Sequence, residues 1–131
     1  MRTVQVRSGK RTEAVDITSV IQQEVASRKL DSGVCLVFSA HTTAGITVNE
    51  HADPAVMEDV LGWLGKRVPY EDNYRHQEGN SAAHIKTMLV GSSAMLPVEK
   101  GALALGRWQG IFLCEFDGPR ERKVYVQFLP E

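Results

Sequence analysis

Four histidines and several carboxylates are the residues of this 131-residue chain whose types could support catalysis or metal binding. His41 ends an apolar run, whereas His76 and His84 lie in a polar stretch. If these three side chains meet in space, they could bind zinc with carboxylate help from Glu50 or Glu115. The spacing matches neither H-E-x-x-H nor a helical H-x-x-x-H pair. For each histidine taken singly, this weak spacing therefore favours a hydrogen-bonded loop or core residue over a metal ligand.

A second candidate lies in the run "WQGIFLCEFD", where side chains alternate between two faces of a predicted strand. One face carries an amide and two carboxylates around two aliphatic residues: Gln109, Ile111, Leu113, Glu115 and Asp117. If the strand is covered on both sides, Glu115 must be paired or must bind a ligand, because a lone buried charge is costly. The alternative is that this polar face is exposed to water.

Arg120 and Arg122 follow this run closely. A guanidinium group binds phosphate or carboxylate through two parallel hydrogen bonds. The alternative is an internal ion pair with Asp117 or Glu121. The chain contains no nucleophile motif and no G-x-x-x-x-G-K-[ST] phosphate loop. Hydroxyl donors to an anion could come from Thr42, Thr43 and Thr47, although threonine is also a good strand former.

The composition indicates one ordinary globular domain, residues 1–131, with 43% hydrophobic and 24% charged residues. The net charge of -1 gives no electrostatic reason to expect nucleic acid or an anionic membrane as partner. No apolar run is long enough to cross a bilayer, and the first 16 residues lack an apolar signal core. We therefore expect a cytoplasmic protein. In such a compartment Cys35 and Cys114 are predicted to be buried free thiols, with a disulfide as the alternative. His51 is predicted to be solvated.

The elements that must position these residues are mostly strands, with a few helices between them. We predict strands in "TVQVRS", "EAVDITS", "GVCLVFSA" (the central one) and "GITVNE", and one in "AMLPVEKG" that lies at an edge or bends at Pro97. Asp53 and Pro54 predict a sharp helix start. Residues 65–84 read as a long loop, in which Asn80 caps a short helix. Residues 108–129 read as a β-hairpin. The fold class is therefore α+β, a β-sandwich-like core of antiparallel or mixed sheets with packed helices.

Four blocks together resemble the YjbQ-like family, which is also labelled secondary thiamine-phosphate synthase. They are "HTTAGITVNE", "DPAVMEDV", "NSAAHIK" and "GSSAMLPVEKGALALGRWQGIFLCEFDGPRERKVYV", and they span nearly the whole chain. The most specific parts are H-T-T-A…N-E, a loop histidine followed by N-x-x-x-H, and G-x-W-Q-G-I…E-x-D-G-P-R-x-R. All of them stand in the order of the family. The resemblance therefore favours the interpretation that "HTTAGITVNE" lines a pocket rather than forming the polar edge of an ordinary sheet.

The resemblance implies a β-rich α+β domain that forms a homotrimer with polar pockets near subunit junctions. It also implies a weak thiamine-phosphate synthase activity, which joins hydroxymethylpyrimidine diphosphate to thiazole phosphate and releases pyrophosphate. The residues of interest that it implies are His41, Thr43, Asn49, Glu50, His76, Asn80, His84, Gln109, Glu115, Asp117, Arg120 and Arg122.

Roles for these residues follow if the reaction is this one, because pyrophosphate departure builds negative charge on the phosphates and positive charge on the pyrimidine methylene. We expect a small phosphorylated or anionic metabolite as the ligand and a divalent metal as cofactor, either zinc at the histidines or magnesium arriving with substrate. The catalytic candidates are Glu50, Glu115 and Asp117. The phosphate-binding candidates are Thr43, Asn49, Asn80, Gln109, Arg120 and Arg122. The metal candidates are His41, His76 and His84.

Two other functions remain open from the residues alone. A metal-dependent hydrolase would hold zinc on the three histidines, with Glu50 or Glu115 taking a proton from the attacking water. A non-catalytic binding module would hold a small anionic metabolite without turnover.

Overall fold

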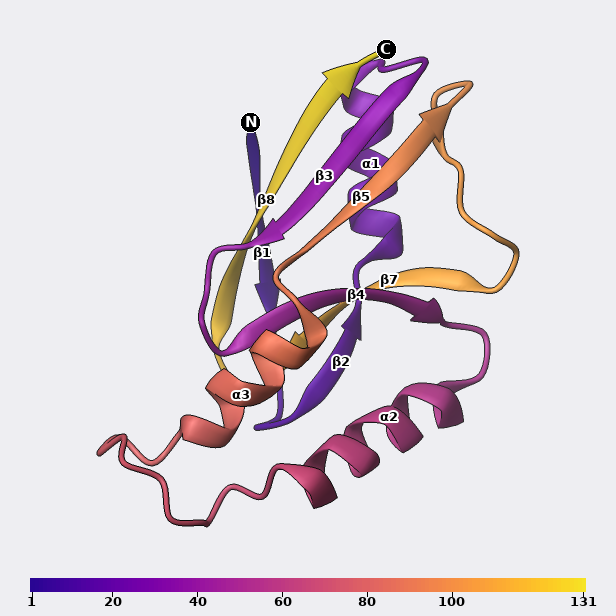
Figure 1. Cartoon of the computed structure of the whole chain (residues 1–131). Coiled ribbons are helices and arrows are strands. Elements are labelled where there is room, and N and C mark those ends of the chain that lie inside the picture. The colour runs from indigo at the N-terminus through magenta and orange to yellow at the C-terminus, as the bar shows by residue number, and fades with distance from the viewer.

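A five-stranded antiparallel sheet forms one side of the protein in the computed structural model, which describes all residues 1–131 (Figure 1). Its order is β1 (Arg2–Arg7), β8 (Glu121–Pro130), β3 (Gly33–Ser39), β5 (Ser93–Glu99) and β6 (Ala102–Leu103). A second antiparallel sheet has the order β2 (Glu13–Asp16), β7 (Gln109–Glu115) and β4 (Ala44–Glu50). Figure 1 shows β4 and β7 running across the direction of β3 and β5.

Three helices complete the fold. Helix α1 (Thr18–Arg28) lies behind the five-stranded sheet in Figure 1, and α2 (Pro54–Arg67) lies along the far side of the three-stranded sheet. Helix α3 (Ser81–Val90) leads from the long loop into β5. The predicted start of α2 is confirmed, because Asp53 Oδ1 accepts the Ala55 amide at 2.9 Å and Pro54 is the first helical residue.

The main core lies between the two sheets and includes the buried side of α1. There Ile21 and Val25 of the helix pack with Ile111 and Leu113 of β7. A smaller apolar cluster on the opposite face of β7 joins Phe112 to α2 and α3. Strand β7 is therefore covered on both faces, which is the condition under which the sequence requires Glu115 to have a partner.

The predicted α+β class is confirmed, and every strand pairing is antiparallel, so the mixed-sheet alternative is excluded. Strand β3 is the middle strand of its sheet, as predicted. Pro97 does not interrupt β5; the strand runs through it beside the two-residue edge strand β6. Cys35 and Cys114 are free and buried, as predicted.

The predicted hairpin over residues 108–129 is wrong, because β7 and β8 belong to different sheets. The backbone between them bonds to other segments: Phe116 N–H donates to Thr43 O at 3.1 Å and Gly118 N–H to Arg11 O at 3.0 Å. Gly118 is needed at this corner, since a Cβ there would lie 2.3 Å from Lys10 O. Alternation along two strands looks the same whether they pair with each other or with separate partners.

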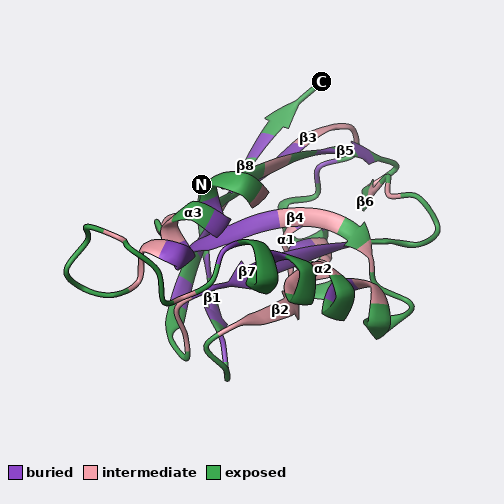
Figure 2. Ribbon diagram, turned by 60° about the horizontal axis from the view of Figure 1, so that its bottom comes forward, coloured by how far each residue is buried: buried purple, intermediate pink, exposed green.

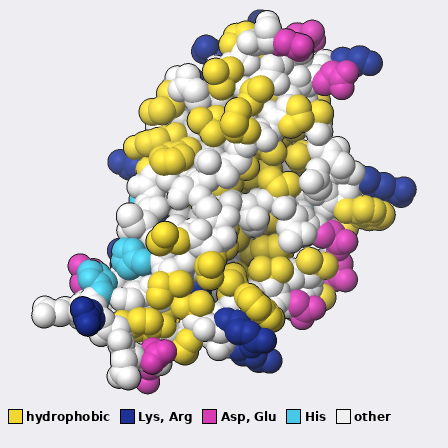
Figure 3. All heavy atoms as spheres, viewed as in Figure 1, with side chains coloured by type: hydrophobic (Ala, Val, Ile, Leu, Met, Phe, Trp, Pro, Cys, Tyr) yellow, Lys and Arg dark blue, Asp and Glu magenta, His cyan; other side chains and the backbone are white.

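The outer face of the five-stranded sheet carries no helix. Exposed apolar side chains on it include Phe38, Met95 and Leu129, and Phe38 stacks on Tyr125 with ring centroids 6.3 Å apart. Figure 3 shows hydrophobic side chains gathered over this part of the molecule. None of the three helices combines the length and the apolar character that crossing a membrane requires.

Candidate functional site

A pocket of about 310 Å³ opens where β4 begins, and none of its lining residues is hydrophobic. We call it the histidine–arginine pocket. It is lined by His41, Thr42, Thr43, His76, Glu78, Asn80, His84, Asp117, Arg120 and Arg122. Three segments far apart in the chain meet here: the β3–β4 connection, the start of α3 with the loop before it, and the corner from β7 into β8.

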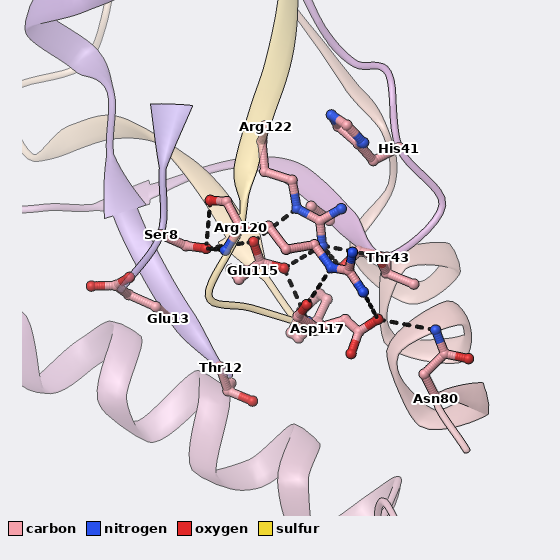
Figure 4. Close-up of polar contacts among 12 residues, drawn as sticks. Ser8, Thr12, Glu13, His41, Thr43, Asn80, Glu115, Asp117, Arg120 and Arg122 are labelled. Carbon is pink, nitrogen blue, oxygen red and sulfur yellow. Dashed lines mark hydrogen bonds and ion pairs between the residues drawn. The ribbon is translucent and has the colours of Figure 1, made fainter. Parts of the chain in front are cut away.

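Glu115 and Arg122 form a buried ion pair behind this pocket (Figure 4). Arg122 Nε donates to Glu115 Oε1 at 2.8 Å, and Arg122 Nη2 donates to Glu115 Oε2. The same Nη2 donates to Thr43 Oγ1 at 2.9 Å. Ser8 Oγ–H donates to Glu115 Oε1 at 2.7 Å, and the Asp117 amide donates to Oε2 at 2.9 Å. The pair thereby ties the residue just after β1 and the residue just before β4 to β7 and β8.

The Glu115 carboxyl has a pKa below its usual value. Burial raises this pKa, but the hydrogen bonds from Arg122, Ser8 and the Asp117 amide, together with the Arg122 charge, lower it by more. Glu115 is therefore an ionised group with its acceptor sites filled, and it does not line the pocket. Its geometry is that of a positioning residue rather than of the acid, base or metal ligand considered from the sequence.

Arg120 is the accessible guanidinium of the site, with its side chain 55% exposed. Its Nε donates to Asp117 O at 2.7 Å and its Nη2 to Asp117 Oδ2 at 3.1 Å. Asn80 Nδ2 donates to the same Oδ2 at 3.0 Å. Asn80 precedes α3 as predicted, but its side chain bonds to Asp117 instead of capping the helix. Asn80 Oδ1 is buried and has no partner, so the site retains one unsatisfied acceptor.

His41 accepts the Lys123 backbone N–H on Nε2 at 2.8 Å. Its pKa is lowered, first by burial and then by the Arg122 charge, so the ring is neutral near pH 7. A neutral ring whose Nε2 accepts a hydrogen bond carries its proton on Nδ1 and has no free lone pair for a metal. This arrangement contradicts the assignment of His41 as a metal ligand and leaves it a hydrogen-bond donor.

His76 and His84 lie together at the outer side of the pocket, with ring centroids 5.3 Å apart in an edge-to-face arrangement. No group of three or more His, Cys, Asp or Glu side chains in the chain is placed to hold a metal ion. The three histidines therefore share one pocket without forming a zinc site within a single chain. Glu78 and Asp117 are the carboxylates that could hold magnesium together with a phosphate.

Three of the predicted site residues lie elsewhere. Asn49, Glu50 and Gln109 sit at the opposite end of the β4–β7 pair, where Glu50 is paired with Gln109. Glu50 is six positions along the strand from Ala44, so this end is about 20 Å from the pocket. Their side chains bond to nearby backbone: Asn49 Oδ1 accepts Glu50 N–H, Glu50 Oε2 accepts the Asp53 amide, and Gln109 Oε1 accepts the Gly106 amide.

Sequence reasoning missed one contribution to the site and one contact outside it. Ser8 connects Glu115 with the Arg120 backbone, whose N–H donates to Ser8 Oγ at 2.9 Å. A serine at the end of a strand carries no signal of this role. Outside the pocket, His51, which was predicted to be solvated, is partly exposed but paired through Nδ1 with Asp16 Oδ2 at 2.9 Å.

By its fold and site, the protein is a small α+β domain with antiparallel sheets and a wholly polar pocket at the corner of a sheet. The chain belongs to the UPF0047 protein YjbQ-like family, whose sequence pattern matches residues 2–131. It is 46% identical over 125 residues to the UPF0047 protein MJ1081 of Methanocaldococcus jannaschii, covering 95% of this chain and 91% of that protein. It is 45% identical over 130 residues to the UPF0047 protein YugU of Bacillus subtilis, covering 98% of each.

Solved structures agree with this assignment. An uncharacterized conserved protein of the yjbq/upf0047 family from Clostridium acetobutylicum superposes with a TM-score of 0.96 at 45% identity, covering 98% of this chain and 100% of the other. A YbjQ-like protein of unknown function from Sulfolobus solfataricus has a TM-score of 0.94 at 37% identity, covering 99% and 96%.

Proposed function

We propose that the histidine–arginine pocket binds a small phosphorylated metabolite and that the protein catalyses a transfer of the thiamine-phosphate synthase type. The observation that carries this proposal is the wholly polar lining of a 310 Å³ pocket with an accessible guanidinium. Arginine suits phosphate because its planar fork of donors matches two phosphate oxygens. The volume is at the lower end of the range for small-molecule sites, which favours a small ligand.

The proposed step breaks the C–O bond between the pyrimidine methylene and the diphosphate. The electron pair leaves with pyrophosphate, and the thiazole nitrogen supplies the pair for the new C–N bond. Arg120 would stabilise the charge that builds on the leaving pyrophosphate. Asp117 and Asn80 would hold Arg120 in position, and neutral His41 would donate from Nδ1 to a ligand oxygen. The reaction needs no protein nucleophile.

Arg122 has a different role from Arg120 in this proposal. Its side chain is 4% exposed, and its Nε and Nη2 are engaged with Glu115 and Thr43. It would act mainly through its charge and by fixing the walls of the pocket. The pocket is open on its solvent side, and a homotrimer that buries the bare apolar face of the five-stranded sheet could place a neighbouring subunit there.

The direct test supplies hydroxymethylpyrimidine diphosphate and thiazole phosphate to the purified protein and measures thiamine phosphate and pyrophosphate. Arg120→Gln should lower turnover by about a hundredfold, since one charge-stabilising donor is lost. His84→Ala should weaken ligand binding without unfolding the protein. Arg107→Gln is the matched control, because Arg107 stacks on Trp108 outside the pocket.

The outcomes separate the candidate functions. Product that depends on Arg120 but not on Arg107 supports the transfer. Tight pyrophosphate binding without product would instead identify a binding module. Elemental analysis of protein purified without chelators tests the metal: about one zinc per subunit would favour a hydrolase, and activity that appears only with added magnesium would place that metal on the substrate phosphates.

A further inference from the structure

A second polar cluster lies at the opposite end of the three-stranded sheet, outside the histidine–arginine pocket. His51 follows β4, and its Nδ1 lies 2.9 Å from Oδ2 of Asp16, the last residue of β2. The other carboxylate oxygen of Asp16 accepts both the amide and the hydroxyl of Thr18, at 3.0 and 2.5 Å. The Thr18 hydroxyl is in turn held by the Ile111 amide at 2.9 Å. Asp16 thus has a fixed orientation and fixes that of His51.

Gly110 makes this pairing geometrically feasible. Strands β2 and β4 are separated by β7, so their ends lie roughly 10 Å apart. The His51 ring crosses over β7 at Gly110, where a Cβ would lie 2.5 Å from ring Cγ and Nδ1. Three strands therefore set the position of the His51 ring: the residue follows β4, its ring crosses β7 at Gly110, and it pairs with Asp16 of β2. Its Nδ1 faces Asp16, which leaves Nε2 available for another partner.

Beside this pair lies a cavity of about 610 Å³ between β2 and α2. Its apolar floor includes Met57, Leu61 and Phe112. Its rim carries five carboxylates, from Glu13, Asp16, Glu50, Asp53 and Glu58, against one lysine. None of the five forms a salt bridge with Lys or Arg. In a protein with a net charge of -1, this concentrates negative charge around an apolar hollow.

We propose that this cavity binds a small organic amine, whose ammonium group contacts the carboxylate rim and donates to His51 Nε2 while its apolar body lies on the floor. The combination follows the usual construction of small-molecule sites, an apolar lining with a few convergent polar groups. The charge of the rim selects a cation, in contrast to the anion selected by the histidine–arginine pocket. This site is independent of the transfer proposed above.

Three probes of matched shape test the charge selection: benzylamine, benzyl alcohol and benzoate. Binding is measured by calorimetry and by two-dimensional NMR of the ¹⁵N-labelled protein, following the His51 and Gly110 amide signals. Benzylamine should bind saturably at one site and shift these signals, with benzyl alcohol at least tenfold weaker. Asp16→Asn should weaken benzylamine about tenfold, because it removes a charged acceptor and releases the His51 ring.

Glu58→Gln gives a variant that cannot disturb the fold through lost hydrogen bonds, since the Glu58 side chain makes none. It should weaken benzylamine about two- to fivefold. Asp59→Asn, on the same helix but outside the cavity, should have no effect, and neither should Arg120→Gln. Equal binding of benzylamine and benzyl alcohol, failure of benzylamine to saturate, or unchanged affinity in both Asp16→Asn and Glu58→Gln would overturn the proposal.

Discussion

Two carboxylate–base pairs lie at opposite ends of the three-stranded sheet and differ in almost every physical respect. Glu115 and Arg122 have side chains that are 0% and 4% exposed, whereas Asp16 and His51 are 42% and 33% exposed. Figure 2 shows the same gradient along β4, which is buried where it begins beside Glu115 and exposed where it ends before His51. The fully buried pair has every acceptor filled, and the exposed pair keeps one ring nitrogen available.

This difference distinguishes charged groups that stabilise the fold from charged groups that are available to bind a ligand. A buried pair with complete hydrogen bonding fixes the chain around it, and removing one partner leaves a costly unpaired charge. An exposed pair contributes little to stability but can exchange its partners for a ligand. In the sequence, Glu115 stands out as a candidate because it is a carboxylate in a core strand. In the structure, however, the nearby residues that remain available to a ligand are Arg120 and His41.

The largest effect should come from Glu115→Ala, which leaves the buried Arg122 guanidinium without its charge partner. We expect a loss of about 3–5 kcal/mol in the free energy of unfolding, measured by urea denaturation. The double variant Glu115→Leu with Arg122→Met should recover much of this loss, because it removes both charges. Glu121→Ala, from a solvent-exposed pair with Arg7, is the control and should cost less than about 0.5 kcal/mol. Equal losses for Glu115→Ala and its control would contradict the structural role.

Gly110→Ala should have the next largest effect. The added methyl group occupies the place of the His51 ring, so the ring must turn away from Asp16. We expect a loss of about 1–2 kcal/mol together with a change in the His51 ring signals in NMR spectra. Gly65→Ala is the matched control, since nothing lies within 4 Å of a Cβ there. Because Gly65 is inside α2, that change should stabilise the protein by about 0.5–1 kcal/mol.

Asp16→Asn should lower stability at neutral pH by no more than about 1 kcal/mol, because the pair is exposed. Burial raises the pKa of Asp16, but the hydrogen bonds from Thr18 and then the contact with His51 lower it by more. The net pKa is below its usual value of 3.8. The ionised carboxylate therefore stabilises the fold above about pH 4, and this contribution is lost as the pH falls through the folded-state pKa. In thermal unfolding experiments the variant should lose less stability over that acid range than the parent protein does. Identical dependence of stability on pH in the two proteins would argue against the pairing.

The smallest effect concerns His41, whose folded-state pKa lies below 6.5 because of burial and the Arg122 charge. As the pH falls below 6.5, the unfolded chain binds a proton on this histidine before the folded protein does, so stability decreases. His41→Asn should flatten the stability profile between pH 6.5 and the folded-state pKa. Chemical denaturation at several pH values gives the slope, and equal slopes in both proteins would exclude a neutral His41.

Local sequence signals predicted most of the elements and the residue types of the site. Asp53-Pro54 marks the start of α2, the apolar run of β3 marks a central strand, and period-two alternation marks β7 and β8. The sequence also predicted that Glu115 must be paired if its strand is covered on both faces, because a covered strand cannot hold a lone carboxylate. The structure supplied that condition by covering β7 on both faces. Nine of the twelve residues implied by the family resemblance lie in or directly behind the histidine–arginine pocket.

Register and sheet membership could not be read from the sequence. Asn49, Glu50 and Gln109 lie at the wrong end of the sheet for the pocket, because antiparallel pairing places Glu50 beside Gln109 and Ala44 beside Glu115. Alternation indicates which side chains share a face but not which strand lies next to it.

By itself, the sequence determined the α+β class and most of the elements, because these depend on local periodicity and capping. Only the tertiary structure decided that β7 is covered on both faces and Glu115 is paired with Arg122, that Arg120 is the accessible cation, and that His51 reaches Asp16 over Gly110. Each of these contacts joins residues from different strands, and such contacts depend on long-range packing that no local pattern encodes.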